Sequence, residues 1–376
     1  MIDYVEIRSS STRELIGIVD NAKSIIWHDV YYSVGDFEVY APCTPENVSV
    51  LVVGNYVTRH DSKNVGIIEK ISVTYNAQDV RMLVASGRFA KSLLDRRLIF
   101  KLSGYSVEAT ILRGNVEDAA RSLVFAHAIN CTFDSSRNMS EITLGESAGT
   151  TKRIVDNYGY ASRKQVTYKE LLAYTDSLLE EYGLGAYCKL DSNLQLAYTV
   201  FEGKDRSVDN TASNQPVIFS QDFDNLLSSE YAYNETSYKN VALVGGEGEG
   251  TKRFCSLVKD DLITGSARRE TWVDSSSTTK TYKDDSDTEH TFTDAEYDEQ
   301  LKTAGMQALA TLSIVETFDG TIDITNGNFK YGKDFSLGDI VTVQDVEIGL
   351  YINPRILEIT EVQDDNGYSI NAKYGK

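Results

Sequence analysis

The sequence predicts a β-rich α+β fold, with two small β-barrels and helix-containing α/β domains inserted between them. Three observations lead to this fold class. Short apolar or alternating segments, bounded by turn residues, fill both ends of the chain, which is typical of barrels and sandwiches. Helix-capping patterns occur only further inside the chain. The 376 residues also include 23 tyrosines and 26 glycines but only 4 prolines, a composition that favours strands joined by turns.

Residues 1–110 are expected to form the first β-barrel. Each predicted strand in this region is short and either alternates or is continuously apolar, and residues 33–36 form a predicted turn. The strand-like segments are residues 4–7, 15–19, 24–28, 37–40, 56–58, 66–73 and 81–85.

Residues 111–240 are expected to form an inserted α+β domain that also completes part of the second barrel. Asn115 precedes acidic residues, as a helix N-cap does. A capping box is predicted at residues 167–170, before a leucine-rich stripe that ends at Gly183. The two predicted apolar faces consist of Ala119, Leu123, Val124 and Ala128, and of Leu171, Leu172, Leu178, Leu179 and Tyr182. A strand pair is expected after the second helix, at residues 186–190 and 194–200.

Residues 241–318 are expected to add strands to the second barrel. They include a polar segment at 274–292, which predicts a mobile surface loop or hairpin. Residues 293–296 have the pattern of a capping box and predict a helix over 293–312. Residues 319–376 are expected to supply the last barrel strands, with a hairpin turn at 364–367.

Two distant segments resemble each other and predict an internal repeat. Their first glycines, Gly54 and Gly338, lie 284 positions apart, and their final alanines, Ala85 and Ala372, lie 287 apart. Each segment has a turn, two strands, a hairpin and a further strand. A trimer of a chain with two equivalent barrels would present six equivalent units around one axis. Closed rings are the usual product of such head-to-tail contacts, so we expect a trimeric ring.

The overall charge excludes some classes of partner. The formal net charge is −19, which argues against tight binding of a nucleic-acid backbone or of an anionic membrane. No apolar run is long enough to span a membrane, and no signal peptide is visible, so no membrane anchor is expected. The four cysteines are widely spaced and predict buried thiols of a protein made in a reducing cytoplasm.

No motif predicts a catalytic, cofactor-binding or metal-binding residue. The glycine-rich segment 245–250 lacks the lysine spacing and the following helix of a phosphate loop, so it predicts a flexible turn. The histidines lie far apart in the sequence, and His127 is expected to be a packed side chain. The acidic cluster at 284–289 lacks the pattern of a calcium loop, so we interpret it as solvated charge. A catalytic set brought together only by folding remains open.

Several segments, taken together and in order, resemble the siphophage tail-hub proteins, also described as tail-associated or minor structural tail proteins. They extend over nearly the whole chain and comprise residues 24–28, 31–40, 66–69, 87–89, 94–97, 245–250, 269–270 and 334–341. The family is similar to the central baseplate hub of contractile phages and to the hub of type VI secretion spikes. The resemblance implies two tube-like β-barrels in a trimeric ring.

The resemblance also implies a structural role in the virion tail. Such a hub would close the tail tube at the tip, bind the distal tail protein, the tape-measure protein and the receptor-binding or fibre proteins, and open for DNA, which passes through without specific binding. Many members of the family carry peptidase or fibre activity in a C-terminal extension, which is not expected here because the predicted barrel strands end near Lys376. The resemblance therefore implies no catalytic residue, and it implies no cofactor. Two alternatives remain: a tail-borne cell-wall peptidase or glycan hydrolase with a site within 111–240, and a carbohydrate-binding β module.

Overall fold

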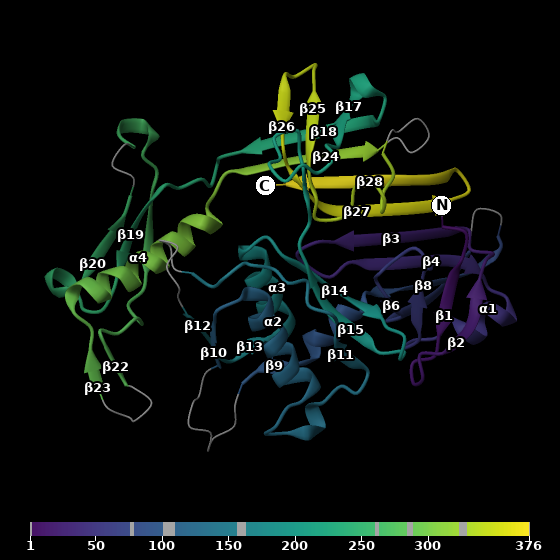
Figure 1. Ribbon diagram of the computed structural model, residues 1–376, viewed down its shortest axis with the longest axis horizontal. Coiled ribbons are helices and arrows are strands. Elements are labelled where there is room, and N and C mark those ends of the chain that lie inside the picture. Colours follow the sequence, from purple (N-terminus) through teal and green to yellow (C-terminus); the bar gives the residue numbers. More distant parts are fainter. Residues whose placement is uncertain are drawn as a thin grey trace.

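The computed structural model describes residues 2–75, 79–100, 110–155, 163–259, 263–283, 289–322 and 329–375. Four parts of the chain can be followed in Figure 1, and each contains a hydrophobic core; the core of the second part also includes Tyr56, Val65 and Ile67 of the first. We call them the N-terminal module (2–89), the helical insert (90–204), the C-terminal module (205–234 with 315–375) and the distal unit (241–312). The two modules lie next to each other, the helical insert lies below them in this view, and the distal unit lies at the left.

The N-terminal module consists of two sheets with a core between them. Alternation of side chains places Trp27, Phe37 and Ile7 in this core, and each is at most 1% exposed. A short helix, α1 (Pro45–Val50), is capped by the side chain of Thr44. One sheet has the order β2 (Leu15–Val19), β1 (Val5–Arg8), β5 (Tyr56–Thr58), β6 (Gly66–Ile67), and the other has the order β3 (Ser24–Val30), β4 (Asp36–Pro42), β8 (Arg81–Arg88), β7 (Lys70–Tyr75).

The C-terminal module has a core of its own, centred on Phe219, Phe318 and Tyr374, which are fully buried. Four of its strands continue the larger sheet in the order β18 (Leu226–Asn234), β24 (Val315–Ile322), β28 (Gly367–Gly375), β27 (Arg355–Asp364). The opposite side of the core is formed by β16 (Asp205–Arg206), β17 (Ile218–Ser220), β25 (Ile340–Asp345) and β26 (Leu350–Ile352), all of which meet at β25.

The two modules share one continuous sheet, which differs from the predicted pair of closed barrels. Strand β27 pairs with β3, so that twelve strands belong to the same sheet and no closed barrel forms in the described residues. Figure 1 shows β28, β27, β3 and β4 side by side. Without this pairing, β3 of one module and β27 of the other would each leave backbone N–H and C=O groups unpaired along one edge. Pairing the two edges gives these groups hydrogen-bonding partners.

The predicted repeat has a clear counterpart in the backbone hydrogen bonds. The Gly54 N–H donates to the Ile68 carbonyl, and the Ile68 N–H donates to the Asn55 carbonyl. In the same way, the Gly338 N–H donates to the Ile356 carbonyl, and the Ile356 N–H donates to the Asp339 carbonyl. Both glycines have positive φ, +94° and +88°, which glycine adopts without strain. The hairpin that follows is also equivalent: Ile71 pairs with Ala85 in the N-terminal module, and Ile359 pairs with Ala372 in the C-terminal module.

The helical insert packs two helices against small sheets. Helix α2 (Val116–Val124) is capped by Asn115, and the predicted face of Ala119, Leu123, Val124 and Ala128 is buried. A π-helical segment, Phe125–Ile129, follows α2, and the 3-10 helix Ala90–Arg96 precedes the insert's first strand. The remaining elements are β9 (Leu98–Ile99), β10 (Thr110–Arg113), β11 (Ile142–Leu144), β12 (Arg163–Val166), β13 (Lys169–Glu170), α3 (Leu171–Glu181), β14 (Gly185–Leu190) and β15 (Leu196–Phe201).

The capping box predicted at residues 167–170 is wrong. Helix α3 begins at Leu171, and its N-cap, Glu170, makes no capping hydrogen bond with its side chain. Lys169 and Glu170 instead pair with β9, so their backbone is extended and the helix begins only after them. Leu171, Leu172, Leu178 and Leu179 are buried as predicted, and Gly183 follows the helix with φ +71°.

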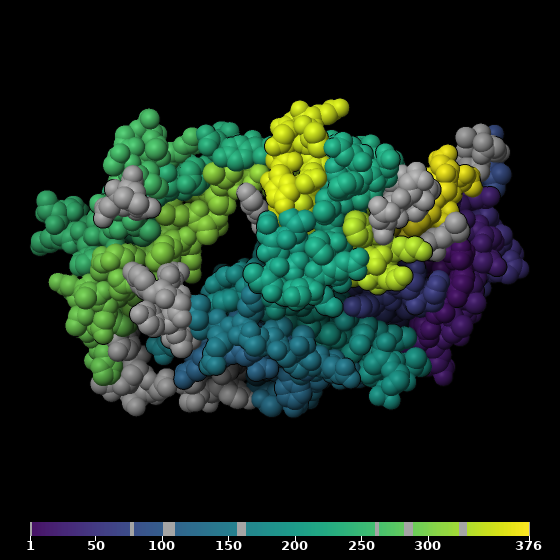
Figure 2. Space-filling model, turned by 45° about the horizontal axis from the view of Figure 1, so that its top comes forward, coloured from purple at the N-terminus to yellow at the C-terminus, as the bar shows by residue number. Residues whose placement is uncertain are grey.

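The distal unit is a small three-stranded sheet covered by one helix. The sheet has the order β20 (Cys255–Val258), β19 (Val241–Gly245), β21 (Glu270–Asp274). Helix α4 (Asp294–Thr311) begins with the predicted capping box of Thr293 and Glu296. Strands β22 (Thr281–Lys283) and β23 (Glu289–Thr291) form a hairpin within the polar segment, and residues 284–288, which hold most of the acidic cluster, lie outside the described ones. Figure 2 shows an opening between this unit and the rest of the molecule.

No helix among the described residues is long and apolar enough to cross a membrane.

Candidate functional site

The joint between the two modules is the most elaborate polar site of the described structure. Strands β3 and β27 pair antiparallel from Ser24 opposite Asp364 to Val30 opposite Glu358. The pairing brings the beginning and the end of the sequence together. Side chains alternate along both strands, so the joint has one side that faces the cores and one that faces away from them.

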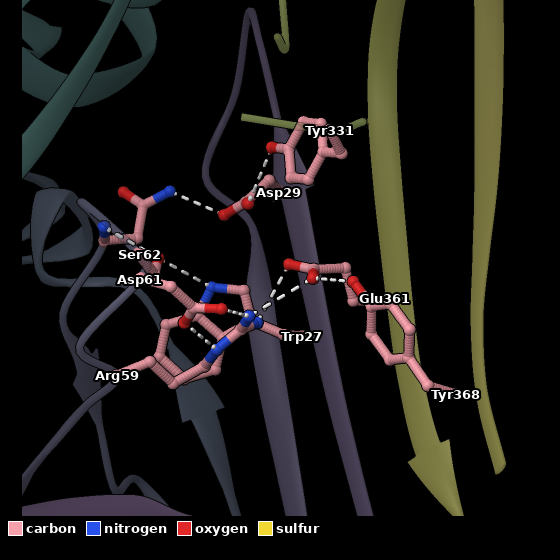
Figure 3. A network of polar contacts seen from close by, with 9 residues as sticks. Trp27, Asp29, Arg59, Asp61, Ser62, Tyr331, Glu361 and Tyr368 are labelled. Atoms are coloured by element: carbon pink, nitrogen blue, oxygen red, sulfur yellow. Dashed lines mark hydrogen bonds and ion pairs between the residues drawn. The ribbon is translucent and has the colours of Figure 1, made fainter. Parts of the chain in front are cut away.

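On the core-facing side, Arg59 connects the two modules. Its guanidinium donates to both carboxylate oxygens of Glu361, at 2.9 and 3.2 Å, and to Asp61, at 3.0 and 2.9 Å. It also lies over the ring of Trp27, 5.2 Å from the centroid. Burial alone would lower the pKa of Arg59, but the hydrogen bonds and charges of Glu361 and Asp61 raise it instead. Figure 3 shows this network, in which the hydroxyl of Tyr368 also donates to Glu361.

Asp29 lies beside this cluster and is buried on the same strand as Trp27. Its carboxylate accepts a hydrogen bond from the Asn64 side-chain amide at 2.7 Å. It accepts a second one from the Tyr331 hydroxyl at 3.4 Å (Figure 3). Burial raises the pKa of Asp29 from 3.8 to about 6, because the charged form loses its water; the negative charge of Glu361 adds to this effect. The joint therefore contains a carboxyl group that titrates near neutral pH.

The side of the joint that faces away from the cores holds a second set of ion pairs. His28 contacts Asp36 through Nδ1, at 3.2 Å, and Glu358 through Nε2, at 3.1 Å. Lys373 donates to the other oxygen of Glu358 at 3.0 Å. Partial burial alone would raise the pKa of Glu358, but Lys373 and His28 hold it below its usual value. These contacts join four neighbouring strands, β28, β27, β3 and β4.

Tyr31, directly after β3, connects both modules to the helical insert. Its hydroxyl donates to the Gly183 carbonyl at 2.9 Å and accepts from the Gly203 N–H at 3.1 Å. Its ring lies against Gly338, where an added Cβ would approach to 2.2 Å, and Arg355 lies over the ring at 5.4 Å. A cavity of about 470 Å³ opens beside this contact and is lined by all three parts, among them Asp29, Glu361, Tyr187 and Lys204.

The arrangement fixes the relative position of three parts of the chain. A buried ion pair contributes little net stability, because removing charges from water is costly. It does disfavour other registers, since a shifted strand would leave Arg59 or Glu361 buried and unpaired. We therefore interpret the network as the feature that specifies how β27 docks on β3.

Apart from His28, the histidines and motifs considered as possible sites in the sequence lie elsewhere and are not brought together. His127 is buried in the π-helical segment as a packed side chain, and His60 stacks on Tyr4. The glycine-rich segment follows β19 as a turn, and Gly246 gives the Tyr297 and Leu301 side chains of α4 room to pack. No three His, Cys, Asp or Glu side chains in the described ranges are placed to hold a metal ion.

The prediction of four buried thiols is wrong for part of the set. Cys131 and Cys188 are buried, Cys43 is half-buried, and Cys255 on β20 is exposed at the end of a strand. All four are free. Arg59, Asp29 and Glu361 were not predicted as functional residues, because nothing in their local sequence marks strands that pair over such a distance.

Comparison with solved structures identifies the fold. A tail protein from Neisseria meningitidis matches with a TM-score of 0.58 and 14% identity, over 99% of this chain and 96% of that chain. The 43 kDa tail protein of prophage MuSo2 from Shewanella oneidensis gives 0.57 and 13%, over 99% and 98%. Prophage tail protein gp18 from Listeria monocytogenes gives 0.53 and 10%, over 99% and 94%. No curated protein sequence matches the chain.

A family model covers the chain almost from end to end. The match extends over residues 4–376 and is described as Siphovirus ReqiPepy6 Gp37-like protein. The resemblance to siphophage tail proteins and the place in the virion tail, both predicted from the sequence, are confirmed at the level of family and fold. The chain therefore belongs to the Siphovirus ReqiPepy6 Gp37-like family.

Proposed function

We propose that this chain is the hub of a phage or prophage tail tip, a structural protein that acts as a homotrimer rather than as an enzyme. The hub closes the tail tube, connects it to the receptor-binding parts, and opens for DNA ejection. One observation carries the proposal. The blocks β3-β4-β8-β7 and β18-β24-β28-β27 have the same strand order and follow each other in one sheet. A chain with two like blocks can supply two of six positions in a ring, so that three copies meet a sixfold tube.

The side of this sheet that faces away from the cores is suited to a passage. Many of its exposed side chains are polar or charged, and a shallow groove there is lined by residues such as Ser228, Thr360 and Asn371. Acidic side chains outnumber basic ones: Asp36, Glu38, Glu230, Asp319 and Glu358 against Lys70, Arg88 and Lys373. A negative surface repels DNA phosphates, so DNA would pass this face without specific binding.

The remaining partners follow from this position in the tail. A hub at the end of the tube contacts the distal tail protein and the tube on one side, and the receptor-binding or fibre proteins on the other. The tape-measure protein would leave through the same passage as the DNA. The tail proteins of similar fold support the placement, since they match over nearly the whole of this chain.

The proposal is tested on tail particles that contain the chain. Cryo-electron microscopy of these particles should locate the chain at the tip of the tube, in three copies around the tail axis. Particles from a deletion strain should lack a closed tip, and the chain supplied in trans should restore it. A location along the tube, or any other copy number at the tip, would contradict the hub.

A further inference from the structure

The continuous sheet ends in two strands that lack a second neighbour. Strand β7 pairs only with β8, and β18 pairs only with β24, among the residues the structure describes. Both edges carry exposed apolar side chains: Val73 is 46% exposed, Tyr75 65% and Tyr233 52%. An exposed strand edge with apolar side chains is a template for pairing with another chain.

The joint inside the chain gives the expected geometry of such a pairing. In the first block, Ile71, Ala85, Val39 and Ile25 lie in one row across the four strands. In the second block, the same row consists of Ile359, Ala372, Gly320 and Ser229. Strand β7 is thus the counterpart of β27, and β18 is the counterpart of β3. Since β27 pairs with β3 within the chain, β7 is matched to β18 of another copy.

We propose that β7 of one copy pairs antiparallel with β18 of the next copy, in the register of the β27·β3 joint. This proposal rests on the homotrimeric hub and names the contact that builds it. Within the chain, Thr360 lies opposite His28; the equivalent pair between copies is Ser72 opposite Ala232. Ile71 then lies opposite Tyr233, Val73 opposite Tyr231, and Tyr75 opposite Ser229.

The side chains on the two free edges fit this register. At the internal joint, the core-facing pairs include charged residues, with Glu361 opposite Trp27 and Asp29 opposite Ile359. At the proposed joint, the corresponding pairs combine aromatic and β-branched residues, which stabilise neighbouring strands. The exposed surfaces of Val73, Tyr75 and Tyr233 become covered, and none of these pairs includes a charged residue.

The other face of the proposed joint is also compatible. Thr74 lies opposite Glu230, and Lys70 lies opposite Asn234, so no like charges face each other. The two edges are different surfaces, which makes the contact head-to-tail. Such a contact does not form a symmetric dimer; it closes a ring when the rotation per copy allows it.

Cysteine cross-linking tests the register. We use a Cys255→Ser background, because Cys255 is the exposed native cysteine. Ser72→Cys and Ala232→Cys are placed in separate chains, mixed and oxidised with copper-phenanthroline. Directly opposite side chains have Cβ atoms about 5 Å apart, close to disulfide distance. A Ser72→Cys chain mixed with Ser228→Cys serves as the matched control, since Ser228 is on the same face but about 13 Å along the strand.

The proposed pairing of β7 with β18 predicts a covalent dimer from the mixture of Ser72→Cys and Ala232→Cys chains. It predicts a covalent trimer when both substitutions are in one chain. Each single variant alone should not cross-link. Self-linking of Ser72→Cys, equal reaction of the control pair, or a chain that stays monomeric at millimolar concentration would overturn the joint. A trimer by native mass spectrometry without the in-register cross-link would also overturn it, while leaving the hub itself in place.

Discussion

Arg59 and Glu361 are 302 positions apart in the sequence and form a buried ion pair with an Nη1–Oε1 distance of 2.9 Å. Their side chains are only 1% and 5% exposed. Arg59 follows β5 of the N-terminal module, and Glu361 lies on β27 of the C-terminal module. The pair is therefore a direct measure of whether the two modules are docked.

Glu361→Ala should destabilise the docked state strongly. The substitution leaves Arg59 buried with Asp61 as its remaining carboxylate partner, and breaking one side of a buried pair typically costs about 3–5 kcal/mol. Urea unfolding, followed by tryptophan fluorescence, would measure the loss. Glu38→Ala is the matched control: Glu38 is an exposed acid on β4 of the same sheet, and its loss should change stability by less than about 0.5 kcal/mol.

Replacing both residues of the pair by apolar ones should avoid most of this loss of stability. The double variant Arg59→Met/Glu361→Leu leaves neither charge buried, so it should be more stable than Glu361→Ala. If it were as unstable as the single variant, the unpaired charge of Arg59 would not be the cause of the loss in Glu361→Ala.

Asp29 predicts a pH dependence of stability. Its pKa is about 6 in the folded chain, against an ordinary value of 3.8. The folded state thus holds a proton that the unfolded state releases, so Asp29 favours folding at low pH and this advantage is lost as the pH rises through about 6. The whole shift corresponds to about 3 kcal/mol, of which about 2.4 kcal/mol falls between pH 4 and pH 8.

Asp29→Asn tests this dependence, because asparagine resembles the protonated acid in shape and charge. The variant should be about 3 kcal/mol more stable than the parent at pH 8 and only about 0.5 kcal/mol more stable at pH 4, as measured by urea unfolding at both values. Asp61→Asn is a useful comparison, since Asp61 is more exposed and its pKa is lowered by Arg59 despite partial burial. A gain in stability that is equal at pH 4 and pH 8 would contradict the raised pKa of Asp29.

Tyr31→Phe should loosen the contact between the helical insert and the modules. The hydroxyl accepts from Gly203 and donates to Gly183, so its loss leaves two backbone groups without this partner. We expect a loss of about 1–3 kcal/mol. Hydrogen exchange should become faster in residues 183–204 and remain unchanged in β4.

Tyr187→Phe is the control for the loss of a hydroxyl. Its ring packs on Phe201 and under Lys63, contacts that do not depend on the hydroxyl. Equal exchange rates in the two variants would contradict the role given to Tyr31.

Local patterns in the sequence predict local structure well in this chain. The Thr293–Glu296 capping box, the Asn115 cap and the turn before Gly367 all depend on residues a few positions apart, and all three are present. The capping box at 167–170 fails because a distant strand, β9, pairs with residues 169–170 and holds them extended. Tertiary pairing overrode a local preference there.

The joint itself could not be predicted in the same way. Arg59, Asp29 and Glu361 have no common spacing, and only the pairing of β27 with β3 brings them together. The repeat was visible because it preserves a pattern of glycine, apolar strand and hairpin. A repeat does not reveal whether its two copies close separately or share a sheet, because both arrangements satisfy the same alternation of side chains.

Gly54 and Gly338 allow the repeat to be tested by matched substitutions. Both have positive φ and make equivalent backbone hydrogen bonds, so alanine introduces the same backbone strain at either position, about 1–2 kcal/mol. Their surroundings differ: an added Cβ at Gly54 finds its nearest neighbour, the Ser10 Cβ, at 3.7 Å, whereas at Gly338 it would lie 2.2 Å from the Tyr31 ring.

Gly54→Ala should therefore cost about 1–2 kcal/mol, while Gly338→Ala should cost more and also release the Tyr31 ring. Urea unfolding gives the first quantity, and hydrogen exchange at residues 183–204 gives the second, which should change only for Gly338→Ala. If Gly338→Ala fails to fold, the double variant Tyr31→Ala/Gly338→Ala removes the clash and should recover folding. Equal costs at the two glycines would show that Tyr31 does not hold the C-terminal module in place.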